Sequence, residues 1–280
     1  MTRGKTHIPV SFQLIDTVRK GYCLLDKSTQ AEVAGFIESM QHETGLFTSR
    51  DNSPDLYYSL FGTWMVEALE LSHTRMKIKN FFMRNELNSD YRSSIDSFAS
   101  ILIQSLLIGE NYKKPGYLSL FNFLSGKGMH VDFAYRAFFF LLSYDALYKP
   151  GMVFQFLARV PLYLYALPAD SPSSFQSAVI IAKHSAGMKV DKEADALMSY
   201  FEEEKGFKVY CHQKNADMLS TAVSLFALKK AGSDLRMIAP ACVQLIQENY
   251  RSGAFVAGDG DETRDLEYTF YGLLALGALK

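Results

Sequence analysis

Two stretches near opposite ends of the chain share one arrangement, and this arrangement decides the fold. Residues 36–69 read FIESMQHETGLFTSRDNSPDLYYSLFGTWMVEAL, and residues 246–279 read IQENYRSGAFVAGDGDETRDLEYTFYGLLALGAL. Each begins with an amphipathic stretch, passes through a loop containing Gly-Leu-Phe or Gly-Ala-Phe, and enters an almost wholly apolar stretch at Asp-Leu. A unit that recurs in this way along a chain indicates a repeat architecture.

Weaker copies of this unit lie between the two stretches. The apolar halves of all the copies begin at Asp55, Asp96, Asp132, near Ser173, at Asp217 and at Asp265. An aspartate in front of a helix is a common N-cap, because its carboxylate accepts a free backbone N–H and offsets the helix dipole. The sequence therefore predicts about six helical hairpins, with these aspartates as caps of the apolar helices.

The hydrophobic pattern predicts two layers of helices. In DKEADALMSYFEEEKG (residues 191–206), the apolar residues Ala194, Leu197, Met198 and Phe201 fall on one face of a helix, as in a helix that faces solvent. In YTFYGLLALGAL (residues 268–279) no polar face exists, so this helix must be buried on every side. Alternating outer and inner helices form either an open solenoid or a closed ring.

Closure is the better prediction, because an open array would expose the apolar C-terminal helix at its end. The expected fold is therefore all-α, an α/α toroid of about six helical hairpins with inner and outer layers. No linker rich in Pro, Gly or Ser divides the chain, so residues 1–280 are expected to form a single domain. Residues 1–26 precede the first copy and are expected to be an N-terminal extension packed on the ring.

Composition excludes several classes of protein. The chain has 280 residues, of which 48% are hydrophobic and 21% charged, so it can bury a large core and is not disordered in character. Its formal net charge of −1 gives no basic field for nucleic acid. Three widely spaced cysteines imply no disulfide framework, which predicts a reducing compartment and a cytoplasmic protein.

No stretch is long and apolar enough for a membrane span, and no signal peptide is expected at the N-terminus. The most apolar region, residues 152–168, contains Arg159 and Pro161 and is expected to be a buried helix and turn. Peripheral membrane contact by this region remains an open alternative.

The two clearest copies resemble the repeats of protein prenyltransferase β subunits and squalene cyclases. The residues that carry this resemblance are Gly45-Leu46-Phe47, Pro54-Asp55-Leu56-Tyr57-Tyr58, Gly253-Ala254-Phe255 and Asp265-Leu266-Glu267-Tyr268-Thr269. The resemblance implies an α/α toroid around an aromatic-lined cavity that takes an isoprenoid, either a prenyl diphosphate or a polyprenyl lipid. For a prenyltransferase β subunit it also implies a helical partner subunit.

The resemblance also suggests where an anionic head group would bind. Prenyltransferases begin one inner helix with Asp-x-Cys and place a diphosphate-binding lysine three residues earlier. Here Lys214 precedes Asp217 by three residues, but Leu219 stands where the cysteine would be. Lys214, Asp217 and Arg264 are therefore the expected contacts to a head group. No zinc or other cofactor is expected, because Cys211 and His212 are adjacent and a zinc ion needs about four ligands.

Acid chemistry is the second implication of the resemblance. Terpenoid cyclases use Asp-x-Asp-Asp, in which a protonated aspartate delivers a proton to an alkene. This chain has Asp259-Gly260-Asp261-Glu262 in a glycine-rich loop and Asp265-Leu266-Glu267 at a helix start, and neither is that motif. The expected catalytic pair is Asp265 with Glu267, and Glu267 is the better proton donor because burial in an apolar helix raises the pKa of a carboxyl group.

Aromatic residues on the expected inner helices complete the candidate site. The substrate-binding candidates among them are Tyr57, Tyr58, Trp64 and Tyr268. Their rings could line a chain pocket or stabilise a cation, although aromatic stripes are more often plain core. Two alternatives stay open. A centre filled by Phe138, Phe139 and Phe140 would favour a non-catalytic interaction scaffold, and a glycosidase would need two facing carboxylates.

Overall fold

The computed structural model describes residues 8–84, 94–116, 119–120, 133–148, 159–160, 162–164, 167–168 and 170–280. Helices make up most of this part of the chain, and its strands form short antiparallel pairs. The all-α prediction is thereby confirmed. Within these residues, no helix combines the length and apolar character that crossing a membrane requires.

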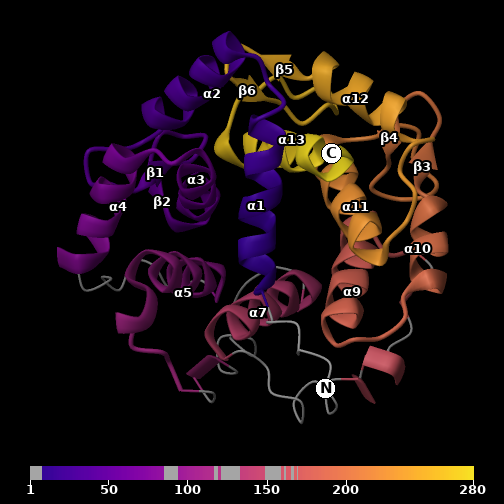
Figure 1. Ribbon diagram of the computed structural model, residues 1–280, viewed down its shortest axis with the longest axis horizontal. Coiled ribbons are helices and arrows are strands. Elements are labelled where there is room, and N and C mark those ends of the chain that lie inside the picture. The colour runs from indigo at the N-terminus through magenta and orange to yellow at the C-terminus, as the bar shows by residue number, and fades with distance from the viewer. Residues whose placement is uncertain are drawn as a thin grey trace, which may run out of the picture.

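One series of helices surrounds the centre of the view in Figure 1. We call its members the inner helices: α3 (Leu56–Leu69), α5 (Ser94–Ile108), α7 (Phe133–Tyr148), α9 (Ser173–Ser185), α11 (Met218–Ala231) and α13 (Leu266–Leu279). Each inner helix packs against the next in this order, and the last, α13, also packs against the first, α3. A 3₁₀ turn, η1 (Gly109–Asn111), follows α5.

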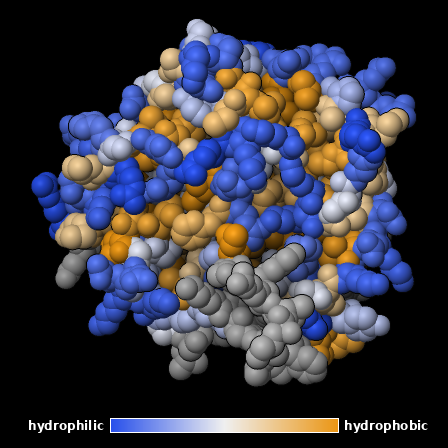
Figure 2. Space-filling model, in the orientation of Figure 1, coloured by the Kyte–Doolittle hydropathy of each residue, from blue (hydrophilic) through white to orange (hydrophobic). Residues whose placement is uncertain are grey.

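A second set of helices lies at the periphery of the same view (Figure 1). These outer helices are α2 (Lys27–Ser39), α4 (Ser72–Arg84), α10 (Asp191–Met198) and α12 (Ala239–Glu248). Helix α4 contacts α3 and α5, α10 contacts α9 and α11, and α12 contacts α11 and α13. On the face seen in Figure 2, hydrophilic side chains dominate the margin, and hydrophobic ones show between them toward the middle.

The hydrophobic pattern predicted the inner and outer helices correctly, but it predicted the C-terminal end of α10 wrongly. Helix α13 is buried along almost its whole length, as expected for a helix without a polar face. Ala194 and Leu197 form the buried face of α10, but Met198 ends the helix and is 38% exposed. Phe201, expected on the same helical face, instead lies in a strand opposite Phe207. The helix stops because this pairing turns the chain back.

Short hairpins connect outer helices to inner ones. They are β1 (Phe47–Thr48) with β2 (Pro54–Asp55), β3 (Phe201–Glu202) with β4 (Gly206–Phe207), and β5 (Tyr250–Arg251) with β6 (Ala254–Phe255). In the clearest copies the hairpin phenylalanine, Phe47 or Phe255, packs on the inner helix at Gly62 or Gly272. A Cβ added at these glycines would lie 2.5 or 2.4 Å from the ring. Glycine on the inner helix therefore lets the hairpin phenylalanine pack directly on the helix backbone.

Aspartate caps begin three inner helices, as predicted. Asp55, Asp217 and Asp265 accept backbone N–H groups from Tyr58, Ser220 and Tyr268 at 2.8, 2.7 and 2.8 Å. The other copies differ. Asp96 lies inside the first turn of α5, which begins at Ser94, and α9 begins after Pro172 without a side-chain cap. Asp132 lies outside the described residues.

Helix α1 (Val10–Tyr22) crosses the C-terminal ends of inner helices and contacts α13, α3 and α7. Arg19 Nε donates to the carbonyl of Ala68 near the end of α3, at 3.1 Å. Where α1 crosses α13, Gly21 and Gly277 bring the backbones together, and a Cβ added at Gly277 would lie 1.8 Å from the Thr17 carbonyl oxygen. This crossing tolerates only glycine, so α1 has one position on the helices beneath it.

Candidate functional site

The N-terminal ends of several inner helices meet at one end of the molecule, which we call the mouth. Backbone hydrogen bonds join neighbouring starts: Ser173 N donates to Val209 O, and Met218 N donates to Ala257 O, each at 2.8 Å. These bonds place the start of α9 beside the loop before α11, and the start of α11 beside the loop before α13. Helix α1 lies at the opposite end, against the helix C-termini.

A cavity of about 330 Å³ lies between the inner helices and α1. Its lining is almost wholly apolar, with side chains from α1, α3, α7, α9, α11 and α13. Equivalent positions of three copies face it. Six residues after the capping aspartates, the lining residues are Phe61, Val223 and Tyr271; nine residues after them, they are Trp64, Phe226 and Leu274. A repeat that presents the same positions inward therefore forms the wall.

Aromatic rings make up much of the wall between α3 and α13. Phe61 packs against Phe270 and Tyr271 with ring centroids 5.2 and 5.7 Å apart, and Trp64 lies 5.4 Å from Phe270. Trp64 is only 3% exposed and lines the cavity. These contacts join the first and last copies of the repeat.

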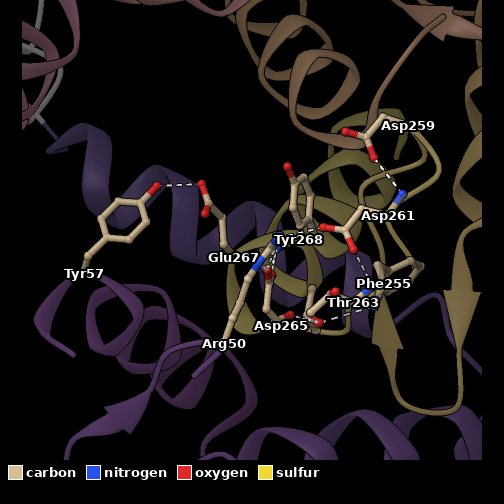
Figure 3. Close-up of polar contacts among 10 residues, drawn as sticks. Arg50, Tyr57, Phe255, Asp259, Asp261, Thr263, Asp265, Glu267 and Tyr268 are labelled. Atoms are coloured by element: carbon tan, nitrogen blue, oxygen red, sulfur yellow. Dashed lines mark hydrogen bonds and ion pairs between the residues drawn. The ribbon is translucent and has the colours of Figure 1, made fainter. Parts of the chain in front are cut away.

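A partly buried acid and a tyrosine lie one helical turn above this wall. Glu267 on α13 and Tyr57 on α3 occupy equivalent positions, two residues after their capping aspartates, and point toward each other (Figure 3). The Tyr57 hydroxyl donates to Glu267 Oε1 at 2.6 Å. Burial raises the pKa of Glu267 to about 7, and nearby Asp265 adds to this, against the opposing effects of the Tyr57 hydrogen bond and Arg50. The third equivalent residue, Leu219, lines the cavity.

Arg50 joins the loop before α3 to the start of α13. Its Nε donates to Asp265 Oδ2 and its NH1 to Asp261 Oδ2, each at 2.7 Å, while the guanidinium lies 5.5 Å from the centre of the Tyr268 ring (Figure 3). The Asp265 side chain is fully buried, so it serves as a cap and as the partner of Arg50. Burial nevertheless raises its pKa above the ordinary value.

Acidic groups dominate the described part of the mouth. Burial raises the pKa values of Asp55 and Asp217, and each is raised further by another carboxylate, Asp96 and Asp259 respectively. Helix N-termini attract anions when their N–H groups are free. Here the aspartate carboxylates already occupy N–H groups of three helices. The caps therefore offset the positive charge that these helix N-termini would otherwise present to an anion.

The structure groups some of the predicted site residues and separates others. Tyr57, Glu267 and Tyr268 lie together at the mouth, with Tyr58 beside Tyr57 at 5.7 Å between ring centroids. Asp217 caps α11 and also accepts from the Ser220 hydroxyl.

The two cations expected at a head group are both exposed side chains. Arg264 is exposed, its guanidinium lies 5.7 Å from the ring of Phe36 on the outer helix α2, and its NH1 donates to Ser252 O. Lys214 is exposed in the loop before α11. Arg50 contacts two carboxylates at the mouth, and no sequence motif distinguished it from other loop residues.

No group of three side chains suited to a metal ion occurs among the described residues. Cys211 and His212 have separate neighbours: Cys211 Sγ lies 3.5 Å from Ser199 Oγ, and His212 Nδ1 lies 3.3 Å from Asp170 Oδ1. His212 also stacks on Tyr210. Comparisons of the chain with protein-family models, with curated proteins and with solved structures find no match.

Proposed function

We propose that the chain is an α/α toroid that binds one isoprenoid, or a similar apolar chain, in its central cavity and acts on its leading end with Glu267. The toroid is supported by the order of contacts, in which the inner helices pack in sequence and α13 returns to α3. The observation that carries the proposal is an apolar cavity whose lining on α13 begins at Phe270, three residues after Glu267, an acid whose pKa is raised to about 7.

The size and lining of the cavity support a single apolar chain. Its volume of about 330 Å³ is at the small end of small-molecule sites. The wall offers aromatic faces and aliphatic side chains, with few polar atoms to satisfy sugar hydroxyls. This lining argues against a glycosidase, which would need an open polar groove around two carboxylates.

The charge of the mouth favours a leading end without a diphosphate. A diphosphate would lie near the carboxylates of Asp217 and Glu267, while Arg50 is already engaged by two aspartates. Like charges in a partly buried site repel strongly. An uncharged end, such as an alcohol or epoxide, avoids this repulsion, so a polyprenyl lipid is the better candidate than a prenyl diphosphate.

Glu267 would act as a general acid at this end. A group with a pKa near the working pH holds its proton and can still release it, which suits proton transfer at neutral pH. In the proposed step the Glu267 carboxyl group donates its proton to the oxygen of the leading end. The O–H bond of the acid breaks as a new O–H bond forms, leaving a carboxylate that the Tyr57 hydroxyl stabilises.

The alternative, a non-catalytic scaffold, would have a solid centre. Phe138 and Phe139 line the cavity and do not fill it, while Phe140 packs against Phe98 and Tyr144. A ring that served only as a scaffold would gain stability by filling this space. The empty volume therefore favours ligand binding over the scaffold.

Trp64 gives a direct test, because it is the only tryptophan in the chain and lines the cavity. We expect farnesol to change its fluorescence in a saturable way. Ala178→Phe fills part of the cavity and should weaken binding at least ten-fold while the far-ultraviolet circular dichroism stays the same. Ala196→Phe, on the exposed face of the outer helix α10, is the matched control and should bind normally.

Two outcomes would overturn the proposal. One is the absence of any saturable response to farnesol or related alcohols. The other is a response that Ala178→Phe and Ala196→Phe affect equally, which would place the ligand outside the cavity. The acid role has a separate test: Glu267→Gln should retain farnesol binding and abolish turnover of a reactive prenyl epoxide, and unchanged turnover would remove that role.

A further inference from the structure

We infer that helix α1 sets the length of the apolar chain that the cavity accepts, with Val10 and Leu14 forming its floor. This inference rests on the proposed function and adds to it a determinant of substrate size. Helix α1 precedes the repeat and is absent from the pattern that builds the ring. Its two lining residues nevertheless close the cavity at the end away from Glu267.

The position of α1 follows from its contacts. Arg19 donates to carbonyl groups of Glu67 and Ala68, at the C-terminal end of α3, and Gly21 packs on α13 beside Leu273. The mouth residues lie at the opposite, N-terminal ends of the same two helices. A chain that enters at the mouth therefore meets α1 last.

The start of α1 is held in place. The backbone N–H of Val10 donates to Asp145 Oδ2 on α7 at 2.6 Å, and this contact is buried. Leu14 follows one turn later on the same face and is only 7% exposed. With the glycine crossing at the other end of α1, the helix is fixed at two points. A fixed helix can act as a steric stop.

The depth of the cavity can be worked out from the repeat. On α11 the uppermost lining residue is Leu219, level in the repeat with Glu267 and Tyr57, and the deepest is Phe226, seven residues further along the helix and level with Trp64 and Leu274. At a rise of 1.5 Å per residue, these two levels are about 10 Å apart. Leu14 lies at the bottom of this short space. Removing its side chain would lengthen the space, and a bulkier side chain would shorten it.

Three variants test the inference through the Trp64 fluorescence response. The ligands are prenyl alcohols of two, three and four isoprene units, and the readout is the ratio of their dissociation constants. Each methylene group that a longer ligand newly buries contributes about four-fold in affinity. We expect Leu14→Ala to shift the ratio about ten-fold toward the longer alcohol, and Leu14→Phe to shift it toward the shorter one.

Ile15→Ala is the matched control. Ile15 lies on the same helix and is 6% exposed, but it is not among the described lining residues. Ile15→Ala should keep the wild-type ratio of dissociation constants even if its thermal stability falls as much as that of Leu14→Ala. Unchanged ratios in folded Leu14→Ala and Leu14→Phe would overturn the inference and leave the proposed function standing. If wild type binds none of the alcohols, the proposed function fails and this inference fails with it.

Discussion

The raised pKa of Glu267 predicts how the stability of the protein depends on pH. Its pKa is about 7 in the folded chain and 4.5 in an ordinary glutamate. Between these values the folded state holds a proton that the unfolded state has lost, so the free energy of unfolding falls as pH rises. Integrated from about pH 5 to about pH 8, this single group costs about 2.5 kcal/mol.

Glu267→Gln isolates this effect, because glutamine cannot titrate and the other ionisable groups are shared with wild type. Urea unfolding at several pH values should show the variant gaining about 2.5 kcal/mol on wild type between about pH 5 and about pH 8. The groups around Glu267 are Tyr57 on α3, Asp265 on α13 and Arg50, and they remain in both proteins. Glu203→Gln, at an exposed position, is the control and should follow wild type. Parallel profiles for wild type and Glu267→Gln would refute the reasoning.

Two further substitutions test the contact of Arg50 with Asp265 and the crossing of α1 over α13. Arg50→Met leaves the fully buried Asp265 carboxylate without its cation, so it should lower the free energy of unfolding by roughly 2 kcal/mol in urea titrations. A loss below about 0.5 kcal/mol would contradict this expectation. Gly277→Ala should cost about 1–3 kcal/mol and speed proteolysis between α1 and α2, because the added Cβ meets the Thr17 carbonyl. Gly35→Ala is the control, because it lies on an exposed helix face with open space around it and should be neutral or stabilising. An equal loss of unfolding free energy in both glycine variants would contradict the role of Gly277 at the crossing of α1 and α13.

The features that the sequence predicted correctly depend on short-range patterns. The apolar stretch of α13 and the capping aspartate at its start are adjacent in the chain, so the helix and its first residue could both be predicted. The end of α10 could not, because Phe201 leaves the helix to pair with Phe207 in a hairpin. Helical periodicity carries no information about where such a pairing interrupts it.

The candidate site also contains residues that the sequence could identify and residues that it could not. Glu267 and Tyr57 could be chosen because each lies two residues after a capping aspartate in a recognisable copy. Arg50 could not, because its two carboxylate partners are more than 200 residues away and lie beside it only after α13 meets α3. The expected cation, Arg264, is one residue from Asp265 in sequence, yet its side chain lies over Phe36 on the outer layer. Closeness along the chain therefore did not identify the cation that pairs with Asp265.

The meeting of distant copies also bears on which ligand the mouth could bind. A repeat whose first and last copies meet brings together side chains that no single copy contains, here an acid from one and a phenol from the other. In the copy that begins with Asp217 the equivalent residue is Leu219, which belongs to the apolar wall. The mouth is thus polar where α3 meets α13 and apolar at the start of α11. An amphiphile with one uncharged polar end fits this asymmetry, because its oxygen can face Glu267 while its chain remains among apolar side chains.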